Sequence, residues 1–490
     1  MKIKISRNVF APAAQVIVSG VVLFVLYRYL YDNLGVAQIG VWSLVLAATS
    51  VSRIGDLGLS AGVVKFVAQA LGANDGQKAA DVIQTVILTL GVAMGILLII
   101  GYPLFSMILN YLLPATSVQI GLNILPYALM SLWMMMIVAA LSGALDGCMR
   151  LDLRSVITAV SHFIFLGMVL ILVPMYGLEG VAIAQVVQSA VLLALLWWAL
   201  RHQLKQLPII PLHWKYSILK NMFGYGVKFQ IITVMNMLFD PVVKALLSKF
   251  GGLESLGLYE MANGLVLKAR AIIIEANRVM VPVIAKLATG ETGKAEQMFT
   301  SAYSLNFYGA IALYGLLGIF ASTICVLWLG HYQSTFVYFV LLLNLGWFAN
   351  TLNGPAYFAN LGAGKLEQNM IAHIIMGFFS FILGGLLGAL YGGFGVVSGT
   401  VLGLIAGSLY LLIEYIKRMG SQWHAILLPQ GMANGLLMAG ALIALANGIA
   451  GQTTDFVWAL SSAFICAFIY MVVLYRHPNR RVLLKQNSGE

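Results

Sequence analysis

Residues 82–105 read VIQTVILTLGVAMGILLIIGYPLF and contain no charged side chain. A helix needs about 20 apolar residues to cross the roughly 30 Å hydrocarbon core of a bilayer, so this stretch is typical of a membrane-spanning helix. Similar apolar stretches follow one another along nearly the whole chain. The composition agrees, because 61% of the 490 residues are hydrophobic and only 9% are charged, whereas soluble domains are about 25% charged. These features exclude a soluble globular protein.

The hydropathy pattern predicts an all-α polytopic membrane protein with about 14 transmembrane helices. The expected spans are 11–31, 38–61, 82–105, 123–145, 155–174, 181–200, 222–247, 258–285, 301–326, 335–358, 371–390, 396–416, 430–449 and 456–475. One side of the membrane then receives nearly all Lys and Arg residues of the connections, and the other side receives only Lys249. By the positive-inside rule we expect a multi-pass protein of the cell inner membrane with both termini in the cytoplasm.

The sequence contains an internal repeat. Three pairs of short segments resemble each other in order and at equivalent helix ends: 144–152 with 359–367, 175–181 with 390–396, and 34–42 with 251–259. The first two pairs are offset by 215 residues (144 to 359 and 175 to 390) and the third by 217 (34 to 251). We interpret this agreement as the trace of an ancient duplication.

The repeat predicts the domain organisation. We expect a first six-helix lobe in residues 1–200, a cytoplasmic linker in 201–221, a second six-helix lobe in 222–418, and two extra helices with a basic cytoplasmic tail in 419–490. Each predicted lobe has six helices, an even number, so the first helix of both lobes enters the membrane from the same side. The two lobes should then be related by a pseudo-twofold axis along the membrane normal, with the substrate path between them.

Charged side chains inside the spans are the main candidates for function, because each costs about 2.5–3.5 kcal/mol at a helix centre. They gather on the first two helices of each predicted lobe. The candidates for substrate binding are Arg28, Arg53, Lys228, Lys244, Lys268, Arg270 and Arg278. The candidates for coupling or gating are Asp56, Asp240, Glu260 and Glu275. The basic residues outnumber the acidic ones, which predicts an anionic substrate.

The spacing of these residues adds detail. At 100° per residue, Glu260, Lys268, Glu275 and Arg278 fall within a stripe about 80° wide on one helix. Asp240 and Lys244 are four residues apart and can pair, with Pro241 between them. The alternative is that the charges snorkel to the interface or form structural ion pairs, above all Arg28, Arg53 and Lys228 near span ends. We interpret His162 and His373 as structural residues and the Asn and Gln residues near helix ends as packing partners.

The sequence shows no motif of a hydrolase, a metalloprotease, an ATPase or a dinucleotide-binding enzyme. The three cysteines, Cys148, Cys325 and Cys466, are far apart and form no CxxC pair, which argues against a metal site or a disulfide framework. We therefore expect a protein that is not an enzyme and needs no cofactor. Its net charge of +11 is explained by membrane topology, so we expect no nucleic-acid partner.

Residues 56–68, DLGLSAGVVKFVA, follow the segment 34–42 and resemble the polysaccharide-transporter branch of the multidrug/oligosaccharidyl-lipid/polysaccharide exporter superfamily. The resemblance recurs at 257–259 and around Pro282. It implies a two-lobed, V-shaped flippase that moves undecaprenyl-pyrophosphate-linked oligosaccharides, such as O-antigen, lipopolysaccharide or exopolysaccharide repeat units, to the outer leaflet by alternating access. It also implies contact with membrane lipid, H⁺ or Na⁺ as a coupling ion, and a polysaccharide polymerase as partner machinery.

Three other functions stay open. A lipid II flippase would carry a chemically related cargo. A multidrug cation antiporter of the same superfamily would usually have twelve spans and an acidic surplus in its cavity. A membrane glycan polymerase or ligase belongs to a different class and generally needs a sizeable outer loop, whereas the outer loops predicted here are short.

Overall fold

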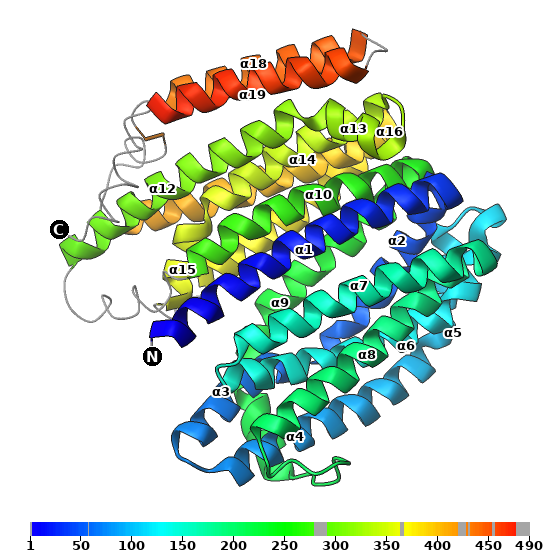
Figure 1. Ribbon diagram of the computed structural model, residues 1–490, viewed down its shortest axis with the longest axis vertical. Helices are drawn as coiled ribbons and strands as arrows, with labels where there is room; N and C mark the ends of the chain where they lie inside the picture. Colours follow the sequence, from blue (N-terminus) through cyan, green and yellow to red (C-terminus); the bar gives the residue numbers. More distant parts are fainter. Residues whose placement is uncertain are drawn as a thin grey trace. The chain divides into compact units, whose positions relative to one another are not determined.

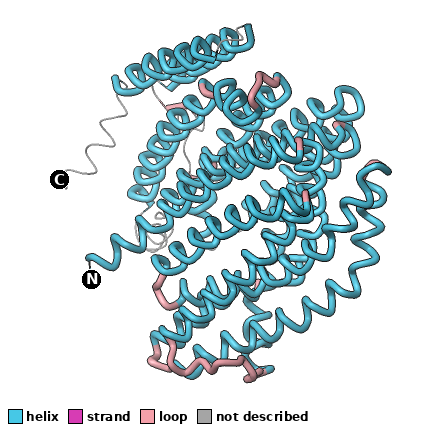
Figure 2. Tube along the Cα trace, turned by 45° about the vertical axis from the view of Figure 1, so that its right-hand side comes forward, coloured by secondary structure: helices cyan, strands magenta, loops and turns pink. Residues whose placement is uncertain are grey.

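The computed structural model describes residues 2–56, 58–278, 292–362, 367–419, 428–429, 432–452 and 456–476. Within these ranges it consists of helices and their connections, without a strand (Figure 2). Eleven of the described helical stretches are long and apolar enough to cross a membrane. The chain is therefore an all-α multi-pass membrane protein, as the hydropathy predicts.

The chain divides into two compact units, residues 1–249 and 250–490. The first contains α1 (Lys2–Leu34), α2 (Val36–Ser50), η1 (Val51–Asp56), α3 (Leu59–Gly72), α4 (Gly76–Thr89), η2 (Leu90–Met94), α5 (Gly95–Leu112), α6 (Ala115–Gly147), α7 (Leu151–Tyr176), α8 (Leu178–Gln203) and α9 (Tyr216–Phe250) (Figure 1). The division places nearly all of α9 in the first unit, whereas the repeat assigns 222–418 to the second lobe. The repeat-based domain boundaries stay a prediction.

The second unit contains α10 (Gly252–Arg278), α12 (Thr292–Ile319), α13 (Ala321–Leu329), α14 (Ser334–Leu352), α15 (Gly354–Gly362), α16 (Glu367–Arg418), α18 (Met432–Gln452) and α19 (Phe456–Arg476). Each of the fourteen expected spans overlaps a described helix, and α16, which is kinked at Gly392, overlaps two of them; residues 279–285, 430 and 431 of the expected spans lie outside the described residues. Helices α9 and α10 are long but are not among the eleven apolar stretches. The charged residues of α10 lower its hydropathy, whereas the side chains of residues 223–238 of α9 lie outside the described part of the chain.

The span expected at 38–61 is wrong as a single helix. Helix α2 ends at Ser50, a 3₁₀ segment follows, and α3 begins only at Leu59. Gly58 has a φ of 76°, a left-handed conformation that suits glycine and interrupts a right-handed helix. Residues 51–58 contain Arg53, Asp56 and two glycines, but the apolar residues on either side favoured a single span in which these charges lie inside the membrane.

The turns of the two units repeat the internal similarity of the sequence. Gly177 joins α7 to α8 with φ 56° and ψ −133°, and Gly392, its partner at the offset of 215, has φ 61° and ψ −140°. Gly35 and Gly252, the partners in the third pair, have φ values of 78° and 74°. Backbone of this kind is accessible mainly to glycine. The same turn conformations therefore lie at matched positions of the two sequence copies.

Helix α6 is central to the packing of the first unit, where it contacts α8, α3, α2 and α5. Glycines allow the close approach of α3. A Cβ on Gly143 would lie 2.9 Å from the carbonyl oxygen of Ser60, and one on Gly147 would lie 3.0 Å from that of Val64. Small residues thus bring the two helix backbones together, which is the packing expected from the many glycines of the sequence.

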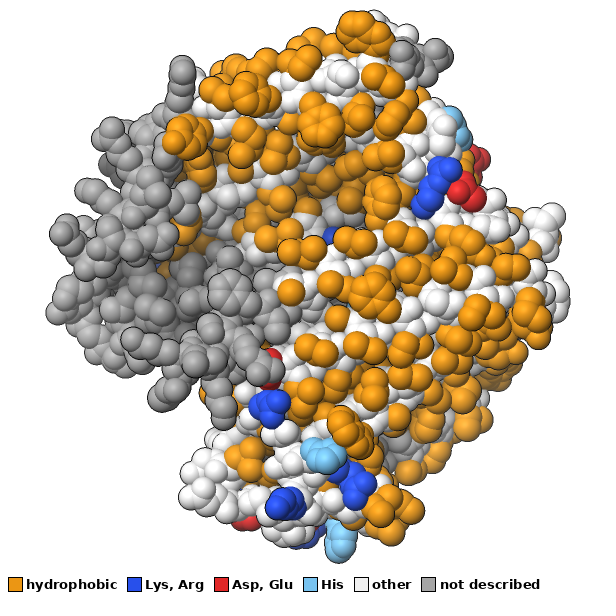
Figure 3. All heavy atoms as spheres, viewed as in Figure 1, with side chains coloured by type: hydrophobic (Ala, Val, Ile, Leu, Met, Phe, Trp, Pro, Cys, Tyr) orange, Lys and Arg blue, Asp and Glu red, His pale blue; other side chains and the backbone are white. Residues whose placement is uncertain are grey.

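The segment between α8 and α9 is bound along α4. The Gln84 side-chain oxygen accepts hydrogen bonds from the backbone N–H groups of Leu212 and His213, at 3.2 and 3.3 Å. Lys215 Nζ pairs with the buried carboxylate of Asp81 at 2.5 Å. Figure 3 shows Lys, Arg and His side chains gathered at the lower end of a largely hydrophobic face, where α3, α4 and this segment lie. The predicted linker is therefore attached to the first unit by specific contacts.

Candidate functional site

A polar cluster inside the second unit surrounds Arg270 of α10. Its Nη2 donates a hydrogen bond to the side-chain oxygen of Asn350 at 2.8 Å. Its Cζ lies 4.8 Å from the centre of the Trp347 ring, which is a cation–π distance. Trp347 and Asn350 are three residues apart on α14 and so present their side chains on the same side of that helix. Two residues of α14 thus orient the guanidinium group.

Further polar side chains hold these two residues in place. The indole N–H of Trp347 donates to Asn263 Oδ1 of α10 at 3.1 Å. The amide of Asn350 donates to the Ser408 hydroxyl of α16 at 3.2 Å. Asn350 is 5% exposed, so its hydrogen bonds form away from bulk solvent and fix its orientation. The cluster is therefore pre-organised by three helices.

A second hydrogen-bonded group adjoins the cluster on α14. The Tyr314 hydroxyl of α12 lies 2.8 Å from the hydroxyl of Thr351, and the Asn306 amide donates to the Thr351 carbonyl oxygen at 2.8 Å. Thr351 follows Asn350 directly in sequence. Helix α12 is thereby attached to the segment of α14 that carries the partner of Arg270.

The charge of Arg270 is not balanced within the described part of the chain, where no carboxylate lies within ion-pair distance of it. Its Nε is buried and has no hydrogen-bond partner among the described residues. A partly buried cation without a counter-charge is unfavourable, and an anion that binds there would remove part of that penalty. A guanidinium can bind phosphate with two hydrogen bonds at once. The arrangement suits a phosphorylated or carboxylated ligand.

The candidate residues of the first unit have other partners. Asp240 and Lys244 form the expected ion pair on α9 at 2.8 Å, with the Lys244 side chain 8% exposed. Arg28 pairs with Asp32 on α1 at 2.9 Å, and both side chains are more than a third exposed, so this pair contributes little to stability. These two pairs match the structural alternative considered for the span charges.

The other two candidates of the first unit lie at the break after α2. Asp56 Oδ1 accepts hydrogen bonds from Ser60 Oγ at 2.8 Å and from Ser60 N at 3.2 Å, so it caps the start of α3. Arg53 lies on η1 with an exposed side chain. A role of Asp56 in coupling and of Arg53 in binding both stay predictions.

The remaining candidates are on α9 and α10. Lys268 and Glu260 are partly buried on α10, in the same unit as Arg270. The side chains of Lys228, Glu275 and Arg278 lie outside the described residues. The structure thus places Arg270 in a polar cluster, and a single cavity that unites the eleven predicted residues stays a prediction.

Sequence reasoning missed the neutral residues that orient Arg270. Asn350, Trp347 and Ser408 were not singled out. A usable signal was present, because Asn344, Asn350 and Asn353 place three amides in one predicted span. Buried amides need partners, so such a concentration indicates a polar interior.

Comparison with known proteins identifies the family. The family profile described as "polysaccharide biosynthesis protein" matches residues 34–331, more than half of the chain. A search of curated protein sequences finds no match. Several solved membrane transporters, however, have a similar fold.

Among the solved structures, the lipid II flippase MurJ in its inward closed conformation has a TM-score of 0.68 at 15% identity, covering 95% of this chain and 98% of its own. An inward-facing multidrug resistance MATE family transporter of the MOP superfamily has a TM-score of 0.65 at 14% identity, covering 84% and 94%. A MOP superfamily transporter from Pyrococcus furiosus has 0.57 at 13%, covering 84% and 96%; its description notes a binding pocket of reverse polarity. These neighbours are transporters, and they show the same fold. The family match shows that this chain belongs to the polysaccharide biosynthesis protein family.

Proposed function

We propose that this transporter flips an undecaprenyl-pyrophosphate-linked oligosaccharide from the cytoplasmic to the outer leaflet of the cell inner membrane by alternating access. The observation that carries the proposal is the partly buried guanidinium of Arg270, whose Nε is buried, which has no carboxylate partner among the described residues and which is oriented by Asn350 and Trp347. A pyrophosphate is the anionic part of such a cargo and has the geometry that arginine binds best.

The proposal includes the direction of transport and its surroundings. Both termini lie in the cytoplasm, where the glycan is assembled on its lipid carrier. The cycle draws on an H⁺ or Na⁺ gradient or on the membrane potential, and the product passes to a polysaccharide polymerase. The family match supports the polysaccharide pathway, and the charge of Arg270 supports an anionic cargo. A multidrug cation would be repelled by the same guanidinium.

The test replaces Arg270 by glutamine, which keeps a polar side chain and removes the charge. The matched control is Arg418→Gln, because Arg418 lies in the last turn of α16. We expect Arg270→Gln to stop glycan export and to leave single lipid-linked units on the inner leaflet, whereas Arg418→Gln exports normally. Leaflet location is read by the accessibility of the glycan to an added lectin in intact and opened spheroplasts.

The outcomes separate the competing functions. Normal surface glycan in an Arg270→Gln strain with normal expression would refute the proposal. Loss of viability upon depletion, without loss of an accessory glycan, would instead assign the protein to lipid II. Single units trapped on the outer leaflet would indicate a lost polymerase.

A further inference from the structure

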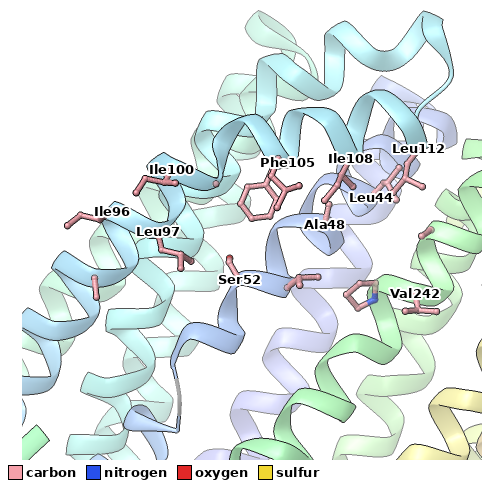
Figure 4. A pocket seen from close by; sticks show the side chains of 16 residues that line it. Leu44, Ala48, Ser52, Ile96, Leu97, Ile100, Phe105, Ile108, Leu112 and Val242 are labelled. Carbon is pink, nitrogen blue, oxygen red and sulfur yellow. The ribbon is translucent and has the colours of Figure 1, made fainter. Parts of the chain in front are cut away.

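An apolar groove lies within the first unit, between α2, α5 and α9, with a volume of about 720 Å³. Leu44 and Ala48 of α2, Ile100 and Ile108 of α5 and Val242 of α9 line it, and Figure 4 shows them on the three helices around the groove. Of the residues that line it, the one polar side chain is Ser52, whose hydroxyl donates to the Thr49 carbonyl oxygen at 2.6 Å. The walls therefore offer no polar group in need of a partner, and water has little reason to fill the groove.

The groove is as long as a membrane is thick. The lining residues on η2 and α5 run from Ala93 to Leu112. At 1.5 Å per residue this stretch rises about 28 Å, close to the roughly 30 Å thickness of a hydrocarbon core. Ile100 lines the groove and is 74% exposed, so the groove is not sealed by protein on that side. A single extended hydrocarbon chain matches this length and this apolar surface.

A cationic side chain lies near each end of the groove. Arg53, which is exposed, directly follows Val51 and Ser52 in the chain, and both of these line one end. At the other end, Lys249 Nζ lies 6.0 Å from the centre of the Tyr111 ring. Tyr111 directly precedes Leu112, which lines the groove. Ser248, the neighbour of Lys249, donates a hydrogen bond to the Leu112 carbonyl oxygen at 2.7 Å and fixes this end.

We propose that this groove holds the isoprenoid tail of the lipid-linked cargo while the headgroup crosses the membrane. The inference rests on the proposed function and adds a separate site for the tail. The headgroup of a cargo that changes leaflets meets an anion-attracting residue at the start and at the end of its path, and its tail keeps one apolar surface throughout. A phospholipid that stays in one leaflet would use only one of the two cations.

The test measures tail-dependent binding to the full-length protein in nanodiscs. The probes are undecaprenyl pyrophosphate and the short-tailed geranyl pyrophosphate. Ala48→Trp fills the groove, and Met107→Trp is the control, because Met107 lies on the same helix as Ile100, is 69% exposed and does not line the groove. We expect Ala48→Trp to weaken binding of the long-tailed probe at least tenfold and to leave the short-tailed probe unchanged. Met107→Trp should change neither.

The two probes separate the two proposals. If the wild-type protein binds neither pyrophosphate, the proposed function fails. If it binds both and Ala48→Trp binds the long-tailed probe normally, only the groove assignment is overturned. Retained binding of the short-tailed probe also shows that the variant is folded.

A cross-linking measurement covers the case in which Ala48→Trp does not fold. p-Benzoylphenylalanine in place of Ile100 should cross-link radiolabelled undecaprenyl pyrophosphate, and the same residue in place of Met107 should cross-link it at least tenfold less. A tenfold excess of diacyl phospholipid should not compete. Equal labelling at both positions, or full competition by phospholipid, would give the groove to bulk lipid and overturn the inference.

Discussion

The glycines of α16 provide a quantitative test of the packing. The two halves of this helix meet after the turn at Gly392, and Gly395, Gly399, Gly403 and Gly407 of the second half recur every four residues. A Cβ on Gly399 would lie 2.3 Å from the backbone nitrogen of Gly384 and 2.4 Å from the carbonyl carbon of Leu383, whereas ordinary contacts begin at 3.4 Å. Backbone atoms cannot rotate away, so the two halves must separate by about 1 Å, and overpacking of this kind costs about 1–3 kcal/mol.

The substitution is Gly399→Ala, and its control is Gly385→Ala in the first half of the same helix. A Cβ on Gly385 would meet nothing within 4 Å. Both changes add the same helix propensity, about 1 kcal/mol, so this contribution cancels between them. We expect Gly399→Ala to be less stable than Gly385→Ala by about 1–3 kcal/mol, seen as a lower melting temperature in the same detergent.

The comparison refutes the packing argument if the two variants melt together or if Gly385→Ala is the less stable. A functional readout adds to the test, because α16 carries Ser408, the hydroxyl that holds Asn350 beside Arg270. Displacement of the second half of α16 should therefore reduce glycan export by more than it reduces the amount of protein in the membrane.

Three further predictions concern single contacts. Asn350→Leu leaves Arg270 without its hydrogen-bond acceptor and should lower the free energy of unfolding by about 1–3 kcal/mol. Asn350→Asp should keep the melting temperature but abolish export, because the new carboxylate pairs with the Arg270 cation. Normal export by Asn350→Asp would contradict the role of the charge. Lys215→Ala removes the ion pair to Asp81, and we expect faster cleavage of the segment before α9 by chymotrypsin, with unchanged cleavage counting against the attachment. Burial raises the pKa of the Cys148 thiol to about 11 despite the nearby positive charge of Arg150. In a variant without the other cysteines, the rate of maleimide labelling of Cys148 should therefore be low at pH 7 and rise about tenfold per pH unit towards pH 11. A plateau of this rate near pH 9 would contradict the raised pKa.

The sequence predicted those features that depend on neighbouring residues. The spans follow from runs of apolar residues, and the paired turns at Gly177 and Gly392 follow from local similarity between the two copies. The ion pair between Asp240 and Lys244 follows from their spacing of four on one helix. None of these predictions required knowledge of how distant helices face each other.

The partners of Arg270 could not be predicted in the same way. Asn350 is 80 residues from Arg270 in the chain, and their contact depends on the rotation of α10 and α14 about their own axes. The break after Ser50 was missed for a different reason, because the capping role of Asp56 resembles an intramembrane charge when only hydropathy is considered. From the sequence alone, the Asp56 carboxylate was a functional candidate, whereas in the structure it accepts hydrogen bonds at the start of α3.

The two arginines Arg53 and Arg270 occupy equivalent places in the repeat. Arg53 lies 18 residues after Gly35 (35 to 53), and Arg270 lies 18 residues after Gly252 (252 to 270), with both glycines at positive φ. In the second copy α10 remains helical through Arg270, which therefore meets α14. In the first copy the helix ends at Ser50, and Arg53 is exposed on a 3₁₀ segment. The two matched segments thus share the position of the charge and differ in the backbone around it, so that one arginine lies in a polar cluster and the other next to an apolar groove.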